Sequence, residues 1–170
     1  AQESRGLGDV YKRQSLYLAA FFILCGGLNG TAASSFSREG KYFWISKVIP
    51  VSFHNQITGK FFHALAVSIL GIIGGAIVTL ILFKINLISL LLGLLIAIIG
   101  TIAFIAIGFS LDLRKPLLDW ISYQKAMKQN INVFFHILIE FTILFCLGYS
   151  AVIALNKKIA PLYIILSLIH

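Results

Sequence analysis

Long apolar runs separated by shorter polar stretches organise this sequence. Four of these runs reach or approach the length of about 20 residues that crosses the hydrocarbon core of a bilayer. They cover residues 16–33, 61–83, 87–109 and 131–155. The second and third contain no Asp, Glu, Lys or Arg, and the fourth contains one acid, Glu140. Because a backbone in lipid must satisfy its own hydrogen bonds, the pattern predicts an all-α, polytopic transmembrane helical bundle.

The two ends of the chain differ from these runs. Residues 1–14 are polar and mixed in charge, and their GLGDVYKRQ stretch resembles a translated cloning linker, although a native amphiphilic tail is the alternative. We therefore expect residues 15–170 to form a partial transmembrane domain. The last apolar run, 160–170, is too short to span and is expected to be the start of a truncated fifth span.

The connections between runs predict a topology. Only Lys84, Ile85 and Asn86 separate the second and third runs, which forces an antiparallel helical hairpin. The two longer connections, 34–60 and 110–130, must then lie on one side of the membrane. They hold eight basic residues: Arg38, Lys41, Lys47, Lys60, Arg114, Lys115, Lys125 and Lys128. The other side holds three outside the suspected linker: Lys84, Lys157 and Lys158. Since cytoplasmic loops retain Lys and Arg, both long connections are predicted to be cytoplasmic in a multi-pass plasma-membrane protein.

Composition agrees with lipid as the solvent. Hydrophobic residues make up 59% of the chain and charged residues 12%, with a mean hydropathy of +0.94. So few charges cannot cover a water-soluble domain of 170 residues. The net charge of +8 is not arranged as a basic stripe with interleaved aromatics, so no nucleic-acid partner is predicted. The two cysteines lie in apolar runs and are interpreted as small buried hydrophobes.

Common catalytic and cofactor motifs are absent from the sequence. It has no GxxxxGK[ST] phosphate loop, HExxH, CxxC or GxSxG motif, and its four histidines are scattered. We therefore predict no catalytic residue, no metal site, no cofactor bound by this chain and no ATPase site of its own.

One polar pair lies inside the fourth run. His136 and Glu140 are four residues apart and share a helix face. Glu140 is about nine residues from the predicted cytoplasmic end, roughly 14 Å deep. A charge at that depth costs about 3 kcal/mol, so Glu140 is expected to face protein or water. A proton relay, a polar lining of a substrate path, an interhelical hydrogen bond and a self-compensating pair all remain open.

The first long connection mixes charges with aromatic residues. Its segment 35–52 reads SFSREGKYFWISKVIPVS, and its charges prevent it from spanning. This mixture predicts a short helix at the membrane interface, with Trp44 at the depth of the headgroups and Pro50 ending the helix. A loop anchored to anionic lipid is the alternative.

The same segment resembles a known family. Ser37-Arg38-Glu39-Gly40-Lys41, then Phe43-Trp44, Lys47, Pro50-Val51-Ser52 and Gly59-Lys60, is similar to a cytoplasmic segment in membrane subunits of type-2 ATP-binding-cassette exporters. A later stretch of that family is similar to Asp112, Arg114, Pro116, Leu118, Asp119 and Trp120, followed by Lys125, Ala126, Lys128, Gln129 and Asn130. The resemblance covers roughly residues 16–155.

This resemblance implies a membrane (permease) subunit that exports an unknown substrate when a separate cytosolic ATPase hydrolyses ATP. It implies the lipid bilayer, that ATPase and a second membrane subunit as partners. The ATPase-coupling candidates are Arg38, Glu39, Gly40, Lys41, Phe43, Trp44, Lys47 and Pro50. The second-loop candidates are Asp112, Arg114, Pro116, Trp120, Lys128 and Asn130. An intramembrane enzyme or a proton-coupled carrier that uses Glu140 and His136 is the alternative function.

Overall fold

The computed structural model describes residues 2–28 and 30–156, and this part of the chain is helical without β-strands. Its long helices are α1 (Gln2–Gly27), α3 (Phe53–Leu82), α4 (Leu87–Arg114) and α6 (Ile131–Asn156). Its short helices are η1 (Ala32–Ser34), η2 (Ser37–Tyr42), α2 (Ile45–Val48) and α5 (Tyr123–Lys128). Four helical stretches, one around each long helix, are long and apolar enough to cross a membrane. The predicted all-α transmembrane bundle is confirmed, and the chain is a multi-pass membrane protein.

The helix boundaries differ from the apolar runs. α3 begins at Phe53 and α4 continues to Arg114, so both helices extend beyond the apolar residues that define their spans. The Ser52 side chain accepts a hydrogen bond from the Asn55 N–H and caps α3. α1 is a continuous helix from Gln2 and ends at Gly27, before the predicted end of the first span at residue 33. The predicted truncated span at 160–170 lies outside the described residues.

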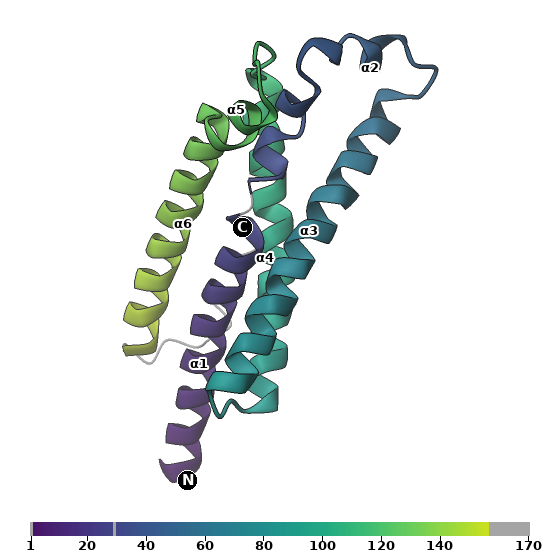
Figure 1. Ribbon diagram of the computed structural model, residues 1–170. Coiled ribbons are helices and arrows are strands. Elements are labelled where there is room, and N and C mark those ends of the chain that lie inside the picture. Colours follow the sequence, from purple (N-terminus) through teal and green to yellow (C-terminus); the bar gives the residue numbers. More distant parts are fainter. Residues whose placement is uncertain (1, 29, 157–170) are drawn as a thin grey trace.

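The tight turn between α3 and α4 sets the topology. α3 ends at Leu82, and Asn86 caps α4 by accepting a hydrogen bond of 2.8 Å from the Ile88 N–H. The predicted antiparallel hairpin is therefore confirmed. As a result, the connections 34–60 and 110–130 lie at the same end of the bundle, which Figure 1 shows at the top. We call this end the connection end.

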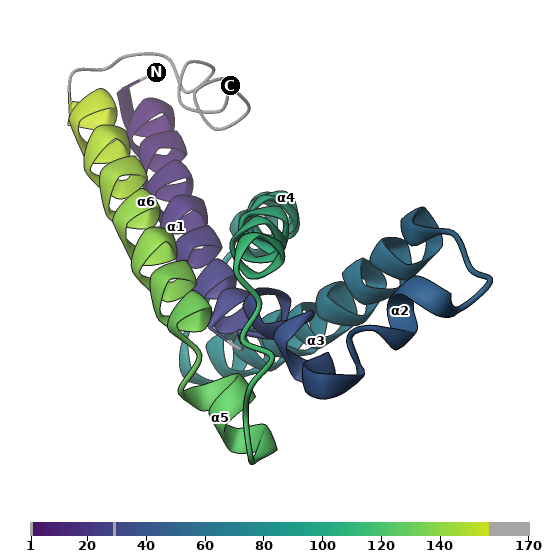
Figure 2. The ribbon, with the colours of Figure 1, turned by 90° about the horizontal axis from the view of Figure 1, so that it is seen from above.

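Helix α1 packs against α3, α4 and α6, and α3 projects away from α6 (Figure 2). The apolar core between α1, α3 and α4 includes Phe22, Ile23, Ile72, Ala97 and Phe104. α1 and α3 approach closely because a Cβ at Gly71 would overlap the Cys25 carbonyl oxygen. One turn further along α3, a Cβ at Gly75 would lie 2.9 Å from Cys25 Sγ. The four-residue spacing of these glycines thus produces the close helix contact that such spacing favours.

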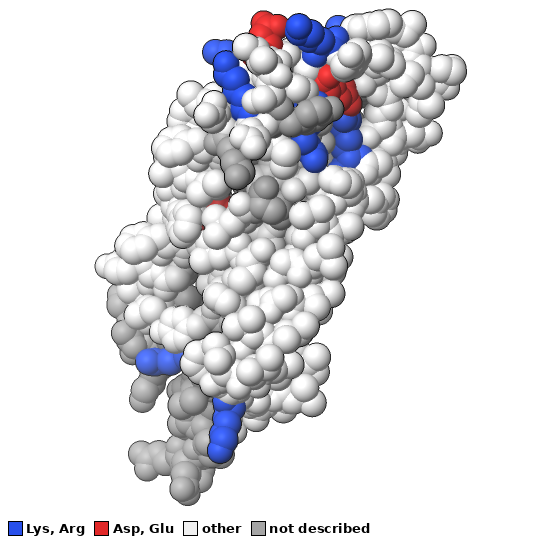
Figure 3. Space-filling view, in the orientation of Figure 1, with Lys and Arg blue, Asp and Glu red and all other residues white. Residues whose placement is uncertain are grey.

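Most charged side chains on the surface lie at the two ends of the molecule. On the face shown in Figure 3, Lys, Arg, Asp and Glu gather at the connection end, a few basic side chains lie at the opposite end, and a broad belt made mainly of other residues lies between them. Large apolar side chains on the outer faces of α3 and α4 are exposed, among them Leu80, Ile81, Leu91 and Leu95. These faces suit contact with lipid.

The orientation of the connection end can be tested by thiol labelling. In a variant without Cys25 and Cys146, we expect cysteines at Ser52 and Ser122 to resist an impermeant thiol reagent in intact cells and to react after permeabilisation. A cysteine at Lys84, exposed in the opposite turn, should react without permeabilisation. Labelling of Ser52 and Ser122 from outside, with protection of Lys84, would invert the orientation.

Candidate functional site

The Asp112 carboxylate, in the last turn of α4, is the centre of a buried polar cluster at the connection end. Asp112 is 0% exposed. Its Oδ2 accepts hydrogen bonds from the backbone N–H groups of Phe36 (2.6 Å) and Ser37 (3.0 Å). Its Oδ1 accepts from the Ser37 hydroxyl and from Asn132 Nδ2 at 3.1 Å. One buried negative charge therefore holds together α4, the first connection and the start of α6.

Ser37 and Asn132 extend this cluster to the second connection. The Ser37 hydroxyl oxygen accepts a hydrogen bond from the Leu117 N–H at 2.8 Å, and the Ser37 carbonyl accepts from Trp120 Nε1 at 2.7 Å. Asn132 Nδ2 also donates to the Lys115 carbonyl at 2.9 Å. We call Phe36, Ser37, Asp112, Trp120 and Asn132 the Asp112 cluster. It fixes both long connections to each other.

Gly40 allows the two connections to meet. Its φ of +52° and ψ of −130° lie in a region that side chains other than glycine rarely adopt. A Cβ at this position would lie 2.6 Å from Cζ2 of the Trp120 ring. The indole ring therefore packs directly on the Gly40 backbone, and a larger residue would separate them.

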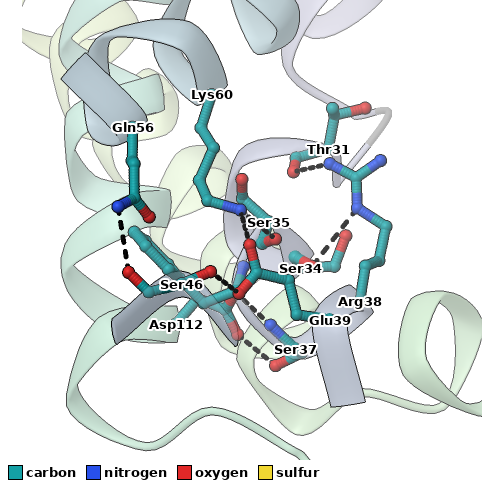
Figure 4. Close-up of polar contacts among 11 residues, drawn as sticks. Thr31, Ser34, Ser35, Ser37, Arg38, Glu39, Ser46, Gln56, Lys60 and Asp112 are labelled. Atoms are coloured by element: carbon teal, nitrogen blue, oxygen red, sulfur yellow. Dashed lines mark hydrogen bonds and ion pairs between the residues drawn. The ribbon is translucent and has the colours of Figure 1, made fainter. Parts of the chain in front are cut away.

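An ion pair attaches the first connection to α3 (Figure 4). Lys60, in the second turn of α3, pairs with the Glu39 carboxylate, which also accepts a hydrogen bond of 2.8 Å from the Ser46 hydroxyl. The Lys60 ammonium lies 5.2 Å from the centre of the Phe36 ring and donates to the Ser35 carbonyl at 3.4 Å. The first connection is thus fixed to α3 as well as to α4 and α6.

Arg38 points into the protein. Its Nε donates to the Ser34 carbonyl at 3.3 Å, and its terminal nitrogen donates to the Thr31 carbonyl at 3.2 Å (Figure 4). The family resemblance implies that Arg38 and Glu39 belong to an ATPase-coupling segment. In the structure, Arg38 bonds to two backbone carbonyls and Glu39 to Lys60 and Ser46, so both side chains have partners within their own chain.

Other residues of the coupling segment face outward. Trp44 is 60% exposed, and the remaining exposed side chains are Lys41, Tyr42, Lys47, Val48 and Pro50. Phe43 is half-buried, with Lys47 Nζ 5.8 Å from the centre of its ring. α2 ends at Val48, two residues before Pro50, in agreement with the predicted short helix. We call Lys41, Tyr42, Trp44, Lys47 and Val48 the outer face.

The residues predicted in the second connection fall into two groups. Asp112 and Trp120 belong to the Asp112 cluster, and Asn130 is buried beside it, with its Oδ1 accepting from the Asn132 N–H at 2.9 Å. Arg114 is exposed and Pro116 is half-buried, while the Lys128 side chain lies outside what the structure describes. A groove of about 570 Å³ joins the two connections at the surface. Its lining consists of Lys41, Tyr42, Asp119, Trp120, Ile121 and Lys125.

His136 and Glu140 face the bundle interior, as their sequence positions predict. They are 2% and 0% exposed. His136 Nε2 lies 2.9 Å from the Phe104 carbonyl oxygen, and the Glu140 carboxyl group packs so closely on Gly27 that a Cβ there would overlap it. Neither oxygen of Glu140 has a hydrogen-bond partner among the described residues. The self-compensating His136–Glu140 pair is therefore not formed.

Comparisons of the chain with models of protein families, with curated proteins and with solved structures each found no match. Within the described part of the chain, no group of three or more His, Cys, Asp or Glu side chains is arranged to hold a metal ion.

Sequence reasoning missed Ser37 and Asn132 as members of the site. Both are small polar residues beside a helix end, where such side chains are common as local caps. A signal was available for Asn132, because it lies one helical turn from His136 and on the same face of α6.

The Asp112 cluster predicts a large effect of one substitution on stability. Asp112→Ala leaves two backbone N–H groups, a hydroxyl and an amide without their acceptor, so we expect the free energy of unfolding to fall by about 3 kcal/mol. The control Asp119→Ala removes the same charge from an exposed position and should change it by at most about 0.5 kcal/mol. Denaturant titration in mixed micelles measures the free energy of unfolding of both variants. Equal stability of the two variants would contradict a central role for Asp112.

A pair of glycine substitutions tests the contact between the connections. Gly40→Ala introduces a strained backbone and a clash with Trp120, so the melting temperature should fall. Gly59→Ala, in α3 with nothing within 4 Å of the added Cβ, should leave it unchanged or raise it, because alanine favours a helix by about 1 kcal/mol. A Gly40→Ala variant as stable as Gly59→Ala would exclude the tight Gly40–Trp120 contact.

Proposed function

We propose that this chain is a membrane subunit of an ATP-binding-cassette exporter, which moves its substrate across the plasma membrane when a separate cytosolic ATPase hydrolyses ATP. The observation that carries the proposal is the first connection, which is attached on its inner side to three spanning helices and leaves the outer face free. An ATPase that drives transport from outside the membrane requires such an attached element on the membrane subunit that it contacts.

The inner attachments give the connection the rigidity that force transmission needs. Asp112 links it to α4, Asn132 links it to α6 through Asp112, and the Glu39–Lys60 pair links it to α3. A force that the ATPase applies to the outer face would therefore be transmitted to three helices through hydrogen bonds and an ion pair. A flexible loop would bend under the same force and transmit little of it.

The outer face has the composition of a protein-binding surface. Aromatic anchors such as Trp44 and Tyr42 often contribute most of the affinity at interfaces, and Lys41 and Lys47 can pair with acidic groups of an ATPase. The absence of a phosphate loop from the sequence fits a subunit whose ATP is bound elsewhere. In this proposal the connection end is cytoplasmic, and a second membrane subunit completes the transport path.

A proton-coupled carrier is the second candidate. It is favoured by the complete burial of Glu140 without a hydrogen-bond partner in the described structure. An intramembrane enzyme receives less support, because His136 and Glu140 form no hydrogen bond with each other and the His136 Nε2 atom is already bonded to the Phe104 carbonyl.

Docking of the ATPase is tested by Trp44→Ala in the complete subunit. Loss of this anchor should cost about 2 kcal/mol of binding energy, roughly a thirty-fold loss of affinity, at an unchanged expression level. ATPase co-purification and ATP-dependent transport are the measurements. The matched control Phe83→Ala removes a similarly exposed aromatic residue at the other end of the bundle and should retain the ATPase.

Arg38→Ala separates docking from folding. Because Arg38 bonds to its own chain, this variant should lose stability and expression before it loses affinity for the ATPase. If the Trp44→Ala variant still co-purifies with the ATPase and still transports, the outer face does not bind the ATPase. A lipid anchor would then be the better account of this surface, since each basic residue adds only about 1 kcal/mol to membrane binding.

A further inference from the structure

Three side chains in the bundle interior carry four buried polar atoms without a hydrogen-bond partner in the described structure. They are Oε1 and Oε2 of Glu140, Nδ1 of His136 and Oγ1 of Thr101. Thr101 is 1% exposed and is as deeply buried as the other two. Buried polar groups are almost always bonded, so a cluster of four unpaired atoms needs a specific explanation.

Helix geometry places the three side chains within about one helical turn of one another along the bundle. His136 Nε2 contacts the Phe104 carbonyl, which fixes the register of α6 against the antiparallel α4. Thr101 lies about one turn before Phe104 in α4, and Glu140 lies about one turn after His136 in α6. Both steps lead away from the connection end by a similar distance. Glu140 and Thr101 therefore lie at similar depth, with His136 one turn nearer that end.

All four atoms offer electron pairs. A carbonyl oxygen can only accept a hydrogen bond, so His136 Nε2 must carry the proton in its contact with Phe104. Nδ1 of the neutral ring then presents a lone pair. The Glu140 carboxylate presents two oxygens, and the Thr101 hydroxyl can accept as well as donate. The cluster thus combines one negative charge with two further electron-pair donors.

No positive charge of the surrounding helices compensates this cluster. α1 from Ser15 to Gly27, α4 from Leu87 to Leu113 and the whole of α6 contain neither Lys nor Arg. Arg38 and Lys60 are directed to other partners at the connection end. In addition, Glu140 packs on Gly27, the last residue of α1, where the carbonyl end of the helix dipole is negative.

We propose that Glu140, Thr101 and His136 form a binding site for a single positive charge, supplied either by a proton or by an alkali-metal ion. Oxygen ligands suit hard cations of this kind, and the described chain has no larger ligand group that would favour a transition metal. Gly27 gives the carboxylate its space, because any side chain there would occupy its position. The site does not depend on the exporter proposal.

Among the described residues, the elements packed around the site contribute few other titratable groups. In α1 the Cys25 thiol faces Gly75 of α3, and Tyr17 is exposed. In α4 the Asp112 carboxylate is already bonded to four donors at the connection end, and η1 contributes no titratable group. Glu140, with His136 beside it, is therefore the group expected to respond to the cation.

The melting temperature of the purified chain in nanodiscs tests the site. One series replaces choline with Na⁺ or K⁺ at constant pH and ionic strength, and another lowers the pH in choline alone. We expect an increase of about 5 °C upon saturation in one of the two series. An increase with Na⁺ or K⁺ identifies an alkali-metal ion, and an increase only upon acidification identifies a proton.

Variants connect this response to the cluster. Glu140→Gln should fold, because an amide can still form hydrogen bonds, and should lose the response in both series. The control Asp119→Asn removes an exposed carboxylate and should keep the melting-temperature response. Thr101→Val conserves volume and should weaken the apparent affinity for an alkali-metal ion roughly tenfold, which keeps the proposal testable if Glu140→Gln does not fold.

Two results would overturn the site. One is a wild-type protein whose melting temperature changes in neither series. The other is a response that persists unchanged in Glu140→Gln or, for an alkali-metal ion, in Thr101→Val. Because neither ATPase nor transport is measured, failure of the cation site and failure of the exporter proposal are distinguishable.

Discussion

The buried charge of Asp112 is the constraint on which the connection end depends. A carboxylate without exposure to water requires donors, and those donors come from the backbone at Phe36 and from the side chains of Ser37 and Asn132. Three segments must therefore converge on the last turn of α4. Loss of the acceptor would cost several kcal/mol, so the connections are held in one arrangement. The tight packing of Trp120 on Gly40 follows from that convergence.

The arrangement of spanning helices could be predicted from sequence because few physical solutions exist. Apolar length sets the number of helices, and the three-residue turn at 84–86 leaves only an antiparallel hairpin. The bonds of the connection end could not be predicted in this way. Ser37 bonds to residues 75 and 83 positions away, and no sequence pattern encodes such long-range contacts. Resemblance brought Asp112 and Trp120 to attention without showing that Ser37 joins them.

Side-chain direction was the least predictable property. In the first connection, Gly40 has a positive φ and interrupts the helical geometry, so a helical projection could not separate the inward Arg38 from the outward Trp44. In α6, the spacing of His136 and Glu140 correctly gave a shared face. It did not give their partners, because the carbonyl of Phe104 and the space at Gly27 belong to other helices.

The close contact of Gly71 with the Cys25 carbonyl has a mechanical consequence for α3. A glycine lying against backbone presents no side chain that interlocks, so it can serve as a fulcrum about which the helix tilts. Gly71 lies eleven positions from Lys60 on one side and eleven from Leu82 on the other, roughly 16 Å in each direction. The two arms of this lever are equal. A tilt of α3 about this contact would therefore move its Lys60 end and its Leu82 end by similar distances in opposite directions.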